Sequence, residues 1–127
     1  MLMGLYLTPW LRRQQARYRY RQALTHIRQG NVDAALGVLP QALDGYPHPA
    51  DIHIELGKAY WYMENTAAAL EHFSAAIALD PTSIRAYGNR GLLYCHQGQD
   101  DLALADWQQA LEHQPGHALI HYNRGLL

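Results

Sequence analysis

The sequence NRGLL occupies residues 89–93 and returns unchanged at residues 123–127, 34 residues later. The same spacing separates Pro47, Pro81 and Pro115. A repeat of this length is typical of a two-element unit that cannot bury its own apolar face and therefore stacks on copies of itself. The sequence thus predicts a repeat protein whose core forms between neighbouring units.

Further columns at this period indicate a unit of two helices. Small residues recur where two helices would cross closely, and large residues in adjoining columns would fill the space between them. The small columns are Gly57, Gly91 and Gly125; Ala35, Ala69 and Ala103; and Ala42, Ala76 and Ala110. The large columns are Tyr60 and Tyr94, and Leu39, Phe73 and Trp107. We expect a single domain, residues 1–127, made of an N-terminal extension (1–15), copies at about 16–49, 50–83 and 84–117, and a partial repeat or capping helix (118–127).

Length and composition limit the class of protein. A chain of 127 residues suits one domain, and 49% hydrophobic with 17% charged residues excludes a disordered chain. No apolar run is long enough to span a bilayer. The lone Cys95 excludes an intrachain disulfide framework and a metal cluster built from cysteines. We expect a cytoplasmic protein, with attachment to the periphery of a membrane as an open alternative.

The columns resemble the tetratricopeptide repeat family, whose pattern is a bulky residue, Leu-Gly, Tyr, then Ala, an aromatic residue, Ala and a closing Pro. Copy two departs from it mainly at Glu64, where a turn glycine is usual, and copy one is weakest, with Arg19 and His26 in its first helix. The resemblance covers about residues 16–127 and implies an all-α fold, an α-solenoid of stacked helix-turn-helix repeats. Copy three carries the pattern best, with Tyr87, Gly91, Tyr94, Ala103, Trp107, Ala110 and Pro115.

Local signals place the ends of a long N-terminal helix. Thr8 followed by Pro9 predicts an N-cap and a first helical residue, and Gly30 predicts the residue just past the helix end. At about 1.5 Å per residue this helix would be roughly 30 Å long and would project beyond the first repeat. Pro40 falls inside a second helix and removes a backbone hydrogen bond, so we expect a kink or break near residues 36–40.

The resemblance implies protein recognition: a scaffold or assembly factor whose concave groove, lined by the first helices, holds a segment of a partner. In several family members an asparagine at the column of Asn89 and Asn123 holds the backbone of an extended peptide, since a carboxamide both donates and accepts. The alternative, that asparagine simply suits a solvated groove, stays open. The expected groove residues are Arg17, Tyr20, Arg21, Glu55, Lys58, Arg85, Asn89, Leu92, Tyr122 and Asn123.

One function known in the family is disfavoured. Some cochaperones grip acidic chaperone tails with a carboxylate clamp of two asparagines, lysine and arginine at set columns. Neither frame of this sequence supplies that set. The columns hold Tyr20, Leu24, Glu55, Arg85 and Asn89 in copies one to three, and Ile54, Lys58, Asn89, Leu119 and Asn123 in copies two to four.

The sequence gives little support for a catalytic or a metal-binding site. His117 and His121 are four residues apart, a spacing that can hold a metal on a helix, but His121 occupies a column that is normally a packing position. Cys95 and His96 are neighbours on a predicted helix, so their side chains point apart. No glycine loop for phosphate is present. We therefore expect that the protein is not an enzyme and that it binds neither a cofactor nor a metal ion.

Charge is divided unevenly along the chain. The first 30 residues hold six arginines and no acid, a balance of +6, while the rest holds four basic and 11 acidic residues, a balance of -7. The acidic remainder would repel phosphate, so the charge pattern disfavours a nucleic-acid partner. Apolar residues directly precede Arg12 and Arg13. This segment either packs on the first helix as a cap or docks to a membrane surface or a partner through Leu7, Trp10, Leu11, Arg12 and Arg13.

The last predicted helix carries apolar residues that no second helix in this sequence covers. They are Ile120, Tyr122, Leu126 and Leu127. Apolar surface left in water costs about 25 cal/mol per Å², so a second copy, a partner or further sequence should bury it. We expect concentration-dependent self-association through this helix.

Overall fold

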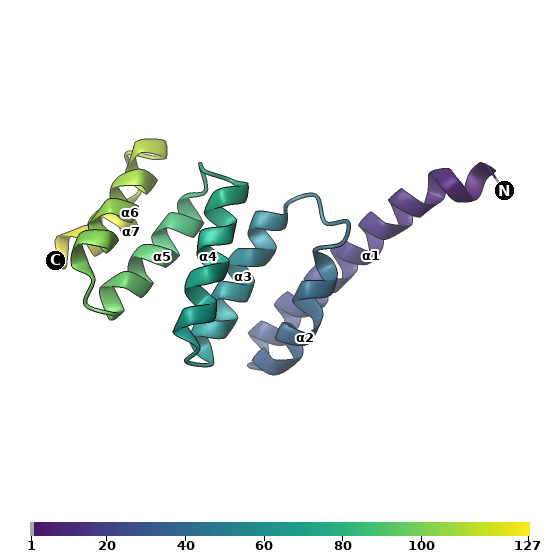
Figure 1. Ribbon diagram of the computed structural model, residues 1–127, viewed down its shortest axis with the longest axis horizontal. Coiled ribbons are helices and arrows are strands. Elements are labelled where there is room, and N and C mark those ends of the chain that lie inside the picture. Colours follow the sequence, from purple (N-terminus) through teal and green to yellow (C-terminus); the bar gives the residue numbers. More distant parts are fainter. Residues whose placement is uncertain (1) are drawn as a thin grey trace.

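The computed structural model describes the backbone of residues 2–127 and the side chains from Thr8 onward, and this part of the chain is helical with no strand. The all-α prediction is confirmed. Successive helices pair and stack into an elongated array, with α2, α4 and α6 in one layer and α1, α3, α5 and α7 in the other (Figure 1). The helices are α1 (Leu2–Arg28), α2 (Val32–Ala42), α3 (Pro49–Tyr62), α4 (Thr66–Leu79), α5 (Ile84–His96), α6 (Asp100–His113) and α7 (Ala118–Gly125).

The tight turn inside each pair uses the same backbone conformation. Gly30 and Gly98 have φ of 79° and 74°, and Glu64, at the same column of the second copy, has φ of 62°. A side chain in this left-handed region costs about 1 kcal/mol, which glycine avoids. The missing glycine in copy two is therefore tolerated, and the turn keeps its shape.

The start of α1 differs from the prediction. Thr8 and Pro9 do not begin the helix, because α1 already begins at Leu2 and runs through Pro9. A proline inside a helix removes one backbone hydrogen bond and can be absorbed by a local bend. The leucines before it are good helix formers, and the helix therefore continues toward the N-terminus.

The predicted break near Pro40 is also wrong. The helix α2 continues through Pro40 and ends at Ala42, where the Leu43 N–H donates to the Pro40 carbonyl. Its length is 11 residues, against 14 for α4 and α6. Because proline lacks only its own N–H, the preceding turns keep their hydrogen bonds. The missing hydrogen bond affects only the last turn, and the helix is short.

The core confirms the small and large columns as packing partners. A Cβ atom on Gly57 would lie 2.6 Å from Cδ1 of Phe73, and one on Gly91 would lie 2.7 Å from Cδ1 of Trp107. Both rings are buried. The glycines therefore let the paired helices approach until the aromatic ring fills the remaining space.

An ion pair locks the third pair of helices. Arg90 on α5 donates to both carboxylate oxygens of Asp106 on α6, at 2.8 and 2.7 Å, and its third nitrogen donates to Ser74 Oγ on α4 at 3.2 Å. One guanidinium thus joins three helices.

Candidate functional site

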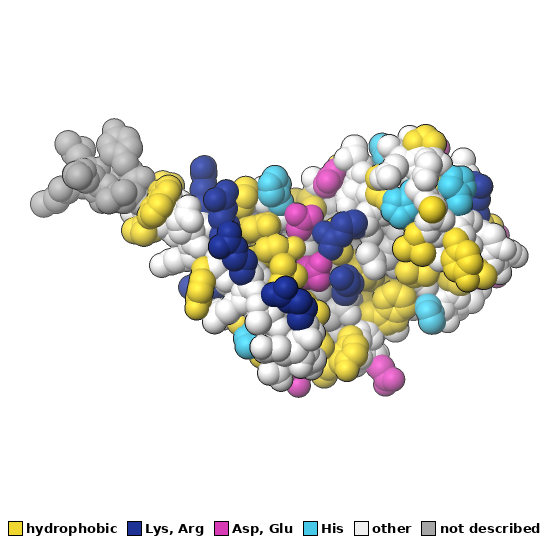
Figure 2. Space-filling model, turned by 180° about the vertical axis from the view of Figure 1, so that it is seen from behind, with side chains coloured by type: hydrophobic (Ala, Val, Ile, Leu, Met, Phe, Trp, Pro, Cys, Tyr) yellow, Lys and Arg dark blue, Asp and Glu magenta, His cyan; other side chains and the backbone are white. Residues whose placement is uncertain are grey.

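The predicted groove residues lie on helices α1, α3, α5 and α7, whose common surface we call the first-helix face. Figure 2 shows this face, with Lys and Arg side chains in a column near the N-terminal end and carboxylates and further basic side chains in the middle. Hydrophobic and histidine side chains gather toward the C-terminal end. The chemical character of the face therefore changes along its length, from basic through mixed charge to apolar.

The middle of the face is a network of charges around Glu55. This carboxylate is only 4% exposed, and Arg85 donates to one of its oxygens at 2.7 Å while the Lys58 ammonium lies 3.4 Å from the other. Arg85 also lies 3.6 Å from Asp51. Because both oxygens of Glu55 are engaged, Arg85 and Lys58 form the surface at this point, and Glu55 holds them in place.

Two tyrosines lie between this network and α1. The rings of Tyr20 and Tyr46 are 4.6 Å apart between centroids. Burial, together with the negative charge of Glu55, raises the pKa of Tyr20 to about 12. Burial also raises the pKa of Tyr46, with Asp51 adding to the shift. Both phenols therefore stay protonated at neutral pH and can act as hydrogen-bond donors.

A polar hollow of about 240 Å³ opens beside these tyrosines. Arg17 and Arg21 line it from α1, and Tyr46, Pro47 and His48 line it from the loop before α3; Tyr20 completes its wall. Both arginines are exposed, and neither guanidinium has a hydrogen bond or ion pair with any side chain that the structure describes. The loop residues were missed by sequence reasoning, because they lie outside the first-helix columns.

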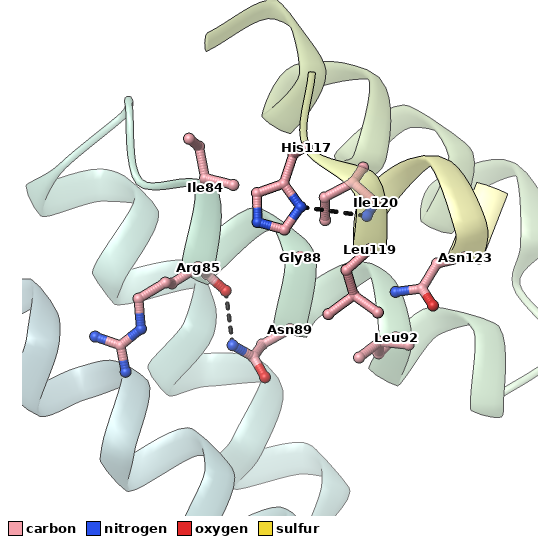
Figure 3. A pocket seen from close by; sticks show the side chains of 9 residues that line it. All are labelled: Ile84, Arg85, Gly88, Asn89, Leu92, His117, Leu119, Ile120 and Asn123. Carbon is pink, nitrogen blue, oxygen red and sulfur yellow. Dashed lines mark hydrogen bonds between the residues drawn. The ribbon is translucent and has the colours of Figure 1, made fainter. Parts of the chain in front are cut away.

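A second hollow, of about 160 Å³, lies between α5 and α7 (Figure 3). Leu92, Leu119 and Asn123 converge between the two helices, and Asn89 lies beside them on α5. The remaining lining residues are Ile84, Arg85, Gly88, His117 and Ile120.

The two asparagines of this hollow differ in their surroundings. Asn89 is half-buried and donates one N–H to the Arg85 carbonyl at 2.7 Å. Asn123 is only 6% exposed, so the alternative of an asparagine in a solvated groove does not hold for it. Its carboxamide has no hydrogen-bond partner in the described part of the chain, and it lines the hollow.

Other residues predicted on α7 lie away from the hollow. Tyr122 is 65% exposed and lines neither hollow, and Leu126 is equally exposed. Together with Leu127 they form an exposed apolar surface, whereas Ile120 is only 3% exposed, so the expectation that it lies uncovered is wrong. Self-association through this helix stays a prediction. His117 accepts from the Ile120 N–H and so caps α7, and the exposed His121 contacts the Pro115 carbonyl at 2.6 Å. Neither is a packed core residue.

A pair of contacting histidines lies outside both hollows. Nδ1 of His53 on α3 is 3.0 Å from Nδ1 of His72 on α4, and the ring of Tyr60 stacks on His72. Burial lowers the pKa of both histidines, which favours their neutral forms. Among the described residues, no group of three potential metal ligands comes together. We read the pair as a contact between the two helices.

The N-terminal docking residues belong to the projecting part of α1. Trp10 and Leu11 are 55% and 48% exposed, so the expected cap on the first helix is wrong for them: the helix continues outward and cannot fold back on itself. Arg12 lies 3.6 Å from Asp44, and Arg13 is exposed. The side chain of Leu7 lies outside the described residues. No described helix combines the length and apolarity needed to cross a membrane.

Comparison with known families matches this architecture. The tetratricopeptide repeat pattern matches residues 20–83 and again residues 84–117. The chain belongs to the tetratricopeptide repeat family. Domains of this family are protein-interaction modules and are generally not catalytic.

Solved structures of tetratricopeptide repeat domains superpose closely on the chain. The first such domain of Spaghetti (RPAP3), solved with the HSP90 peptide SRMEEVD, has a TM-score of 0.82 at 21% identity, covering 90% of each chain. The domain of Arabidopsis OM64 has a TM-score of 0.83 at 15% identity, covering 91% of this chain and 95% of its own. At these identities the likeness shows the fold.

Curated relatives share only a segment. The protein O-mannosyl-transferase F38B6.6 of Caenorhabditis elegans is 37% identical over 54 residues, covering 42% of this chain and 8% of its own length. Neutrophil cytosol factor 2 of Mus musculus is 34% identical over 85 residues, covering 64% of this chain and 16% of its own. The matched segment is thus a small part of the length of each of these relatives.

Proposed function

We propose that the first-helix face binds an extended segment of a partner protein, so that the tetratricopeptide repeat chain acts as a scaffold or assembly factor. The observation that carries this proposal is the hollow between α5 and α7. It combines apolar walls from Leu92 and Leu119 with the carboxamide of Asn123, a largely buried residue whose amide lines the hollow without a hydrogen bond to any described residue. Each hydrogen bond that a ligand makes to such an amide contributes about 0.5 to 1.5 kcal/mol to binding.

An extended peptide has the chemistry to fill this site. Its backbone exposes one N–H and one C=O per residue, and the carboxamide of Asn123 can meet both. Asn89 keeps its oxygen and a second N–H for the same purpose, since only one N–H is bonded to the Arg85 carbonyl. The apolar walls suit an aliphatic side chain of the same segment, whose burial excludes water from the amide contacts.

Relatives support the class of ligand but not its identity. The RPAP3 domain of the same fold is solved with a bound peptide of HSP90. The clamp columns of this chain hold Glu55 and Leu24 where a clamp needs basic or amide groups, so we do not extend the chaperone tail to it. We propose a segment of a different protein.

Binding by Asn89 and Asn123 can be tested with a peptide selected on the purified protein from a displayed library of random peptides. Changing both asparagines to Ala should raise the dissociation constant about 5- to 150-fold, which corresponds to about 1 to 3 kcal/mol. The melting temperature should hardly change, because neither carboxamide holds another side chain. Fluorescence anisotropy and circular dichroism measure the two quantities.

The matched control removes two exposed carboxamides from the other layer, Gln108→Ala with Gln109→Ala on α6. It should leave peptide affinity unchanged. A library that yields no binding peptide, or a peptide whose affinity is equally insensitive to both double variants, would contradict the proposal.

A second candidate is peripheral membrane attachment through the projecting end of α1. The exposed Trp10 and Leu11 beside Arg13 favour it, because an indole and a leucine enter the boundary of a bilayer while arginine meets anionic headgroups. This candidate predicts that the protein floats with anionic liposomes and that Trp10→Ser with Leu11→Ser abolishes flotation. Wild-type protein that stays at the bottom of the gradient would remove it.

A further inference from the structure

We infer that the bound segment carries an anionic group, a carboxylate or a phosphate, that binds in the hollow between Arg17, Arg21 and Tyr46. This inference rests on the proposed function and names the chemistry of the ligand at the N-terminal end of the same face. It assigns a role to a hollow that lies in the first repeat, apart from the asparagine hollow between α5 and α7.

The charge balance of the face points to this place. Lys58 is engaged with Glu55, and Arg85 is shared between Glu55 and Asp51. Arg17 and Arg21, in contrast, have no acidic partner among the described side chains. Both arginines of this hollow therefore carry positive charge that no acidic side chain of the first-helix face compensates.

The spacing of the two arginines favours a shared anion. They stand four residues apart on α1, so both guanidinium groups project from one side of the helix, and like charges at this spacing repel each other. An anion placed between them removes that repulsion. Each guanidinium presents a planar set of donors that fits the two oxygens of a carboxylate or a phosphate.

The opposite wall of the hollow adds a hydrogen-bond donor, and one opposing charge acts on that donor from outside the wall. The hydroxyl of Tyr46 stays protonated at neutral pH and can donate to an anion, and its own surroundings include both arginines and Asp51. Asp51 would repel an anion, but its carboxylate lies 3.6 Å from Arg85, which offsets its charge. The hollow, at about 240 Å³, has room for either group.

Peptides selected from the random library supply the test. We expect them to contain more Asp and Glu than the unselected library. Arg17→Gln with Arg21→Gln should weaken their binding about 10- to 100-fold, as expected for the loss of charge-assisted hydrogen bonds. The control Arg13→Gln with Arg28→Gln removes the same net charge from α1 outside the hollow and should change affinity less than threefold. Circular dichroism checks that both variants fold.

Two variants of a selected peptide distinguish a carboxylate from a phosphate as the preferred anion. Replacing the critical Glu of a selected peptide by Gln should reproduce the loss seen with the arginine variant, and replacing it by phosphoserine should retain binding. Stronger binding of the phosphoserine peptide assigns a phosphate, and weaker binding assigns a carboxylate.

The outcomes separate this inference from the proposed function. One outcome would overturn the anion site alone. In it, the selected peptides lose affinity with the asparagine variant, but they lack acidic residues and bind the Arg17 and Arg21 variant as tightly as the wild type. Equal losses from the two arginine double variants would also overturn it, because attraction would then be a property of net charge. Peptides insensitive to the asparagine and the arginine variants would overturn both.

Discussion

Gly91→Leu is expected to lower the free energy of unfolding by about 3 kcal/mol or more. A Cβ atom on Gly91 would lie 2.7 Å from Cδ1 and 3.0 Å from Cε2 of Trp107, and this indole is rigid and buried. Neither the ring nor the helix α5 can yield without opening the contact between α5 and α6. Thermal unfolding should therefore shift down by roughly 10 °C or more.

The chain offers a control in the same column of the repeat. A Cβ atom on Gly125 would meet no atom within 4 Å, so Gly125→Leu introduces the same side chain into open space. It should leave the melting temperature within a few degrees of the wild type. Equal effects of the two substitutions would show that helix propensity, and not the contact with Trp107, decides the outcome.

Asp106→Ala is expected to cost about 2 to 3 kcal/mol of stability. The change removes the two carboxylate oxygens that accept from Arg90, whose side chain is only 21% exposed, while the Asp106 side chain is itself 6% exposed. The unpaired guanidinium would keep one bond, to Ser74, and must otherwise reach water past the neighbouring helices. Urea unfolding monitored by circular dichroism measures the loss.

An exposed acid on the same helix provides the comparison. Glu112→Ala removes one negative charge from α6 where the side chain is exposed. Its effect should stay within about 0.5 kcal/mol, as is usual for surface substitutions. A loss for Asp106→Ala no larger than this would mean that the ion pair with Arg90 contributes nothing net.

Periodicity made the packing of the fold predictable. The columns of Gly57 with Phe73 and of Gly91 with Trp107 follow the 34-residue spacing, and each pair meets in the structure. Two proline effects could not be predicted in the same way. Whether a helix absorbs Pro9 or Pro40 depends on the balance between one lost hydrogen bond and the packing of the surrounding turns, and that balance is not visible in a local motif.

The candidate site was predictable as a face but not in its details. First-helix columns place Glu55, Arg85 and Asn123 on one surface, yet they do not reveal that Glu55 is buried beneath Arg85 or that Asn123 is enclosed. Those facts arise from contacts between neighbouring copies. Tyr46 and His48 line the hollow beside Arg17 and Arg21 from a loop, and the periodicity of the helices does not predict the course of a loop.

Nuclear magnetic resonance of the labelled protein, titrated with a selected peptide, shows whether the first-helix face holds an extended segment. We expect changes in backbone amide shifts along α1, α3, α5 and α7, largest around Arg17, Arg21, Asn89 and Asn123, with little change on the outer surfaces of α2, α4 and α6. Changes confined to α2, α4 and α6, with the first-helix face unaffected, would contradict the account.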